Sequence, residues 1–75
     1  MILKKHDNKY SIYGQEIISL LRFKNKSQKW LAQQCGITTG MISHIVTGYA
    51  LPSLPVAIKI AKSLDTTVDD IFGSL

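Results

Sequence analysis

Residues 27–48, which read SQKWLAQQCGITTGMISHIVTG, decide the fold of this chain. Ser27 stands where a helix begins, because its hydroxyl can accept hydrogen bonds from backbone N–H groups of the next turn. Residues 28–34 follow without glycine or proline, so they predict a short helix. Gly36 turns the chain sharply after that helix, since glycine adopts positive φ at little cost.

A second short helix follows this turn. Thr38 is its predicted N-cap, residues 39–47 form it, and Gly48 ends it. Ile42 and Ile45 face inward from it at helical spacing. Two short helices joined by a tight turn form a helix-turn-helix, in which the first helix crosses the phosphate backbone of duplex DNA and the second enters the major groove. An ordinary helical hairpin without a ligand is the alternative interpretation.

Apolar side chains at helical spacing predict three more helices around this pair. The helix before it covers about residues 14–24 and buries Tyr13, Ile17, Leu20 and Leu21. The helix after it has Pro55 in its first turn and an apolar face made of Leu54, Ala57, Ile58, Ala61 and Leu64. A short last helix opens with a capping box, in which the Asp70 carboxylate reaches back to Thr67, and its apolar side consists of Val68, Ile71 and Phe72.

The five predicted helices and the lack of a strand pattern indicate an all-α fold. We expect a compact five-helix domain over residues 13–75 behind a polar N-terminal arm over residues 1–12. A length of 75 residues leaves room for one small domain only. Cys35 lies at an inward phase, so it is expected to be a small core residue.

The charge balance favours a polyanionic partner. Nine Lys and Arg residues stand against five acidic residues, which gives a net charge of +4 and a pI near 9.4. Residues 1–62 hold every basic group, whereas residues 63–75 hold three aspartates and no base. One end of the molecule is therefore expected to face DNA while the other avoids it, with a merely soluble basic surface as the alternative.

Little in the sequence supports catalysis, so we expect that the chain is not an enzyme. His6 and His44 are far apart in the chain, Cys35 has no neighbouring base, and no P-loop or paired-carboxylate motif is present. No metal-ligand spacing occurs, and neither a metal nor another cofactor is expected. The apolar runs are far shorter than the roughly 18 residues that span a bilayer, and no signal peptide is evident, so a cytoplasmic location without a membrane partner is expected.

The chain resembles the Cro/repressor-type (XRE-like) helix-turn-helix family of phage and bacterial regulators. The resemblance covers residues 14–72 and rests on Ser27-Gln28, Leu31-Ala32, Gly36, Ile42-Ser43, Gly48, Pro52-Ser53-Leu54, Ile60-Ala61, Leu64 and the closing cap at Thr67. It implies a five-helix DNA-binding domain that acts as a homodimer on near-palindromic operators.

The resemblance also implies which residues contact DNA. The base-reading positions correspond to Thr38, Thr39, Gly40, Ser43 and His44. The positions that contact the DNA backbone correspond to Gln28, Thr47 and Tyr49, and the exposed Lys29 is a further candidate. The base-reading set contains no Arg, Asn or Gln for a bidentate contact, so His44 and the threonine methyl groups are expected to carry most of the direct readout.

Two positions depart from the family together. Many members bury an Arg–Glu pair where this chain has Leu21 and Val46. Replacing both members of a buried ion pair by apolar side chains can be neutral or stabilising, whereas losing one member is costly. We therefore expect Leu21 and Val46 to touch in the core.

Several residues are candidates for a protein contact. Trp30 either packs against Phe23 in the core or meets a partner. Phe72 and Leu75 are expected near the surface and form the predicted dimer interface. The next candidate is the arm around Ile2, Leu3 and Tyr10.

These observations predict a transcriptional regulator that binds duplex DNA sequence-specifically as a homodimer and represses by occlusion. A protein-interaction module on the same scaffold, such as an antirepressor or an antitoxin that captures a protein partner, is the alternative.

Overall fold

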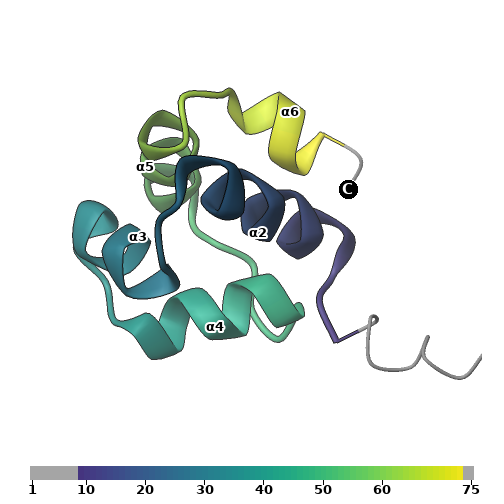
Figure 1. Cartoon of the computed structure of the whole chain (residues 1–75). Helices are drawn as coiled ribbons and strands as arrows, with labels where there is room; N and C mark the ends of the chain where they lie inside the picture. Colours follow the sequence, from purple (N-terminus) through teal and green to yellow (C-terminus); the bar gives the residue numbers. More distant parts are fainter. Residues whose placement is uncertain (1–8, 74–75) are drawn as a thin grey trace, which may run out of the picture.

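The computed structural model describes residues 9–73, and within this range the chain forms five helices and no strand. They are α2 (Ile12–Lys24), α3 (Gln28–Cys35), α4 (Thr39–Thr47), α5 (Leu54–Ser63) and α6 (Val68–Phe72). Figure 1 shows α2 between α4 and α6, while α3 packs against α4 and α5. The predicted all-α architecture is confirmed. None of the helices in the described range has the length and apolar content needed to cross a membrane.

Each described helix begins at a hydroxyl residue whose oxygen accepts a hydrogen bond from the backbone N–H three residues later. These N-caps are Ser11, Ser27, Thr38, Ser53 and Thr67. The predicted caps at residues 27, 38 and 67 are confirmed.

The capping box predicted at the start of α6 is only half formed. The hydroxyl of Thr67 accepts from the backbone N–H of Asp70 at 3.0 Å, as expected. The Asp70 carboxylate accepts instead from the hydroxyl of Thr66 at 3.1 Å. An aspartate is one methylene shorter than the glutamate of a capping box, so its carboxylate serves a nearer donor.

The core lies between the helices and consists of aliphatic and aromatic side chains. Ile17, Leu31 and Ile60 are completely buried there and come from α2, α3 and α5. Cys35 is 2% exposed, so its predicted place in the core is confirmed. Burial raises the pKa of the Cys35 thiol, and the nearby positive charge of Lys59 opposes this shift. The thiol therefore stays protonated and packs as a small apolar group.

The apolar face predicted for the helix that begins at Leu54 is partly wrong. Leu54 is 67% exposed and Ile58 is 38% exposed, whereas Ile60 is completely buried. The buried face of α5 consists of Ala57, Ile60 and Ala61, followed by Leu64 just beyond the helix. Both sets of residues repeat at helical spacing, so periodicity alone left the rotation of this helix open.

The folded domain begins earlier in the chain than predicted, because the predicted arm extended to residue 12. Helix α2 begins at Ile12, and its N-cap Ser11 is already tied to the core. The backbone N–H of Ser11 donates to the carbonyl of Val46 at 2.9 Å. Gly14 lies so close to Val46 that a Cβ on Gly14 would collide with the Val46 carbonyl oxygen. The end of α4 thus fixes the start of α2. This contact joins residues far apart in the chain, so no local sequence pattern predicts it.

The surface position predicted for Phe72 is wrong. Phe72 is 8% exposed, and its ring centroid lies 5.3 Å from that of Tyr13. This aromatic pair joins α2 to α6 and closes the core, because burying two rings together removes a large apolar area from water. Phe72 consequently offers little surface to a second copy, and Leu75 lies outside the described residues.

Trp30 does not pack against Phe23, as one alternative had it. Phe23 is 88% exposed, whereas Trp30 is half-buried against the core. The ammonium of Lys26 lies 5.3 Å from the centroid of the Trp30 ring, in a cation–π arrangement. Phe23 therefore does not contribute to the core, whereas Trp30 packs against it.

Leu21 and Val46 are both buried, at 3% and 1% exposure. An apolar pair therefore does occupy the positions where many family members carry charges. Val46 lies against Gly14, which is two helical turns or about 10 Å along α2 from Leu21. Direct contact between the two side chains stays a prediction.

Candidate nucleic-acid interface

The turn between α3 and α4 depends on Gly36. Its φ of 71° and ψ of 29° lie in the left-handed region, where a side chain is strained. A Cβ at this position would meet no atom within 4 Å, so backbone conformation and not space requires the glycine. The N–H of Ile37 then donates to the carbonyl of Ala32 at 3.0 Å and closes the turn.

Helix α4 divides cleanly into a buried and an exposed side. Its buried side chains, each 1% exposed, are Ile42, Ile45 and Val46. The opposite side carries the predicted contact residues: Thr39, Gly40 and His44 are exposed, and Ser43 and Thr47 are partly so. The burial pattern thus gathers these residues on the helical face opposite the core, and Figure 1 shows α4 at the edge of the domain.

Two threonine hydroxyls at the ends of this face, those of Thr38 and Thr47, already have partners. Thr38 accepts from the backbone N–H of Met41 at 3.1 Å, so its oxygen serves as the cap of α4. The hydroxyl of Thr47 donates to the carbonyl of Ser43 at 2.8 Å. A hydroxyl has a single proton, and phosphate oxygens only accept, so Thr47 would have to give up this bond to donate to a DNA phosphate.

His44 and Tyr49 form a pair at the end of α4. Their ring centroids are 5.8 Å apart and their planes meet at 68°. Gly48, with a φ of 88°, reverses the chain, and the N–H of Tyr49 donates to the carbonyl of His44 at 2.9 Å. Tyr49 is 84% exposed, so its hydroxyl is available to a phosphate beside the imidazole.

Gly40 is not required by the fold. A Cβ on it would meet only the hydroxyl oxygen of Thr38, at an ordinary 3.9 Å, and its φ is not positive. The missing side chain instead leaves the α4 backbone open to close approach by a ligand. The neighbouring Met41 is 43% exposed and was not among the predicted contact residues. The helical phase of Met41 places it at the edge of the exposed face, and this phase is the sequence signal that indicates a further contact residue.

The start of α3 offers a second contact region. Ser27 caps this end by accepting from the N–H of Trp30 at 3.0 Å. The N–H groups of Gln28 and Lys29 belong to the first turn, which has no intrahelical partners. Such a helix start carries partial positive charge and binds phosphate. Lys29 is exposed and Gln28 is partly buried beside it.

Glu16 is exposed in α2, and the other three acidic residues of the described range lie farther along the chain. Asp69 and Asp70 are in α6, which packs on the other side of α2 from α4 (Figure 1). Asp65 lies before α6 and pairs with Lys24 at 2.5 Å. The face formed by α4 and the start of α3 is thus separated from these three aspartates.

Comparison with known proteins agrees with this geometry. The model of a protein family described as Helix-turn-helix matches residues 21–71, well over half of the 75-residue chain. Neither a curated protein nor a solved structure matches the chain. The matched range includes α3, the turn at Gly36 and α4. The chain therefore belongs to the helix-turn-helix family and is a DNA-binding regulator of the Cro/repressor type.

Proposed function

We propose that this regulator is a repressor that binds a specific duplex DNA site as a homodimer and blocks transcription by occlusion. Helix α4 enters the major groove, and the start of α3 contacts the phosphate backbone. The observation that carries the proposal is the exposed face of α4, where Gly40 leaves the helix backbone open beside His44 and Ser43. The proposal includes no catalytic step, and it places the protein in the cytoplasm of a phage-infected or bacterial cell.

The size of the domain supports the proposed dimer. One small helix-turn-helix domain covers one DNA half-site, whereas a dimer spans two half-sites about 34 Å apart, one turn of the duplex. The burial of Phe72 removes it as the main interface residue. Leu51, in the loop between α4 and α5, and Leu54, the first residue of α5, are exposed apolar residues and the more suitable candidates for contact between copies.

Selection from a random duplex library, followed by binding at several salt concentrations, tests this proposal. We expect an enriched site with two-fold symmetry and a log–log salt slope of about −0.9 for each neutralised phosphate. Sedimentation with and without the selected duplex reports the number of copies bound. A flat salt response, or enrichment of no sequence, contradicts the proposal.

A protein-interaction module is the second candidate, and the surface of α4 favours it specifically. This helix exposes Met41 at 43%, and Tyr49 just beyond it is 84% exposed, while α4 offers no Arg, Asn or Gln for base recognition. Affinity capture run beside the DNA selection separates the two candidates. A single tightly bound protein partner without an enriched DNA sequence would favour the antirepressor or antitoxin role.

A further inference from the structure

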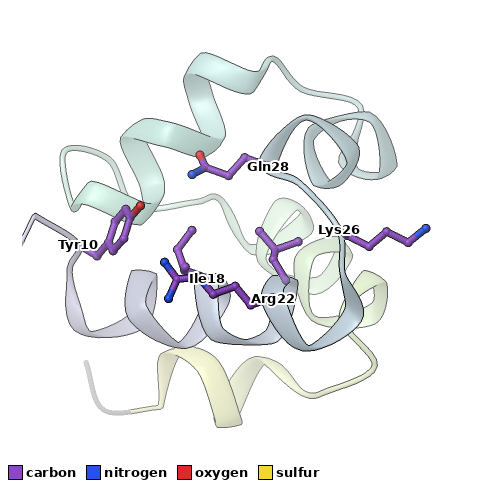
Figure 2. A pocket seen from close by; sticks show the side chains of 6 residues that line it. Tyr10, Ile18, Arg22, Lys26 and Gln28 are labelled. Carbon is purple, nitrogen blue, oxygen red and sulfur yellow. The ribbon is translucent and has the colours of Figure 1, made fainter. Parts of the chain in front are cut away.

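A cavity of about 230 Å³ opens to solvent between α2 and the start of α3. The buried side chains of Ile18 and Leu21 form its floor. Figure 2 shows the guanidinium of Arg22 and the carboxamide of Gln28 pointing toward the space above Ile18, with Tyr10 at its far end. The cavity thus combines an apolar floor with a rim of hydrogen-bond donors.

Residues 9–73 do not occupy the hydrogen-bond donors on the rim of this cavity with carboxylate partners. The ion pair found among residues 9–73 joins Lys24 to Asp65 and leaves Arg22 without a carboxylate partner there. No aspartate or glutamate lines the cavity. The ammonium of Lys9 lies 5.2 Å from the centroid of the Tyr10 ring and adds positive charge at the same end.

Lys26 also lines the cavity, but its ammonium points away from it in Figure 2. The contact with the Trp30 ring explains this direction, because a cation is attracted to the face of an indole. Arg22 is therefore the cation that faces the cavity.

We propose that this cavity holds a phosphate group of the DNA backbone, with Arg22, Gln28 and Tyr10 as donors. The inference rests on the proposed function and extends it to two residues, Arg22 and Tyr10, outside the helix-turn-helix. A guanidinium presents its N–H groups in a planar fork that matches two phosphate oxygens. The start of α3 borders the cavity through Gln28, and this helix crosses the phosphate backbone when a helix-turn-helix docks.

The salt dependence of binding tests the role of Arg22. The probe is a random-sequence duplex, and the two variants are Arg22→Met and Lys62→Met. Each variant removes one positive charge from an exposed side chain. Lys62→Met is the control, because Lys62 lies in α5, which packs against α3 and α6. Circular dichroism verifies that both variants keep the helical fold.

We expect Arg22→Met to lower the magnitude of the salt slope by about 0.9, which is the contribution of one phosphate contact. Between about 50 and 200 mM salt, the loss of affinity should then shrink by about 3.5-fold relative to the wild type, since four raised to the power 0.9 is about 3.5. Lys62→Met should keep the wild-type slope. Equal slopes for Arg22→Met and the wild type would overturn the proposal.

A second measurement distinguishes backbone phosphate from a free anion. The Nε–H resonance of Arg22 is followed by NMR while the wild type is titrated with the duplex or with inorganic phosphate. We expect the duplex to shift this resonance at concentrations far below those at which inorganic phosphate does. Equal potency of the two would assign the cavity to free anions, and an unmoved resonance with bound duplex would exclude Arg22 from the contact.

The two proposals fail in different ways. If the wild type binds DNA with a steep salt slope and Arg22→Met does the same, DNA binding stands and the cavity assignment falls. If the wild type does not bind the duplex at all, both fall. Tyr10→Phe, which removes only a hydroxyl, should weaken binding less than Arg22→Met because it removes no charge.

Discussion

The carbonyl oxygen of Val46 accepts two hydrogen bonds from Ser11, one from its backbone N–H at 2.9 Å and one from its hydroxyl at 3.1 Å. The same hydroxyl oxygen accepts from the N–H of Gly14 at 3.0 Å and so caps α2. One serine therefore joins the start of α2 to the end of α4. This link fixes the helix that carries the exposed contact face relative to the rest of the domain.

Replacing Ser11 by Ala should destabilise the domain by about 1–2 kcal/mol, because it removes a helix cap and a bond to Val46 together. Urea unfolding followed by circular dichroism measures the loss. Ser19→Ala is the matched control, since Ser19 is exposed in the middle of α2 and makes neither contact. Equal stabilities of the two variants would show that the link between α2 and α4 contributes nothing.

Replacing Gly14 by Ala should destabilise the domain by about 2–4 kcal/mol, because the new methyl group collides with the Val46 carbonyl. Backbone cannot rotate away as a flexible side chain can, so α2 and α4 must separate. Thermal unfolding measures the effect. A wild-type melting temperature would mean that the two helices are farther apart in solution.

Replacing Gly40 by Ala should have the opposite effect on stability. The site has space for a methyl group and a helical φ, so the domain should gain about 0.5–1 kcal/mol from helix propensity. DNA affinity should fall if the duplex approaches the bare backbone of α4. Measuring stability and affinity on the same preparation separates the two effects, and unchanged affinity would place the closest DNA contact elsewhere.

Replacing His44 by Ala should weaken binding to the selected site by about 1–3 kcal/mol and leave binding to random duplex nearly unchanged. Lys29→Ala should weaken both equally and lower the salt slope by about one unit, since Lys29 is predicted to contact a phosphate. Competition binding with both duplexes gives the comparison. Equal effects of His44→Ala on both would remove it from base recognition.

Replacing Leu21 by Arg should destabilise the domain by roughly 3 kcal/mol, because it introduces an unpaired charge at a buried position. Adding Val46→Glu should restore part of this loss if the arginine reaches back along α2 to the new carboxylate. A double-mutant cycle in urea measures the coupling energy. Additive effects would show that the two positions are independent.

Much of the fold follows from local patterns. The caps at Ser27, Thr38 and Thr67 and the turn at Gly36 agree with the structure, because each depends on hydrogen bonds or φ values within a few residues. The exposed face of α4 was equally readable, since its buried side carries strongly apolar residues at helical spacing.

The sequence by itself determined which segments become helices, where α3, α4 and α6 begin, where the chain turns at Gly36, and which face of α4 is exposed. Tertiary structure alone decided the rotation of α5, the burial of Phe72 against Tyr13 and the link from Ser11 to Val46. Capping and periodicity act over one or two turns, whereas these features depend on contacts between residues far apart in the chain, and several packings satisfy the same local pattern.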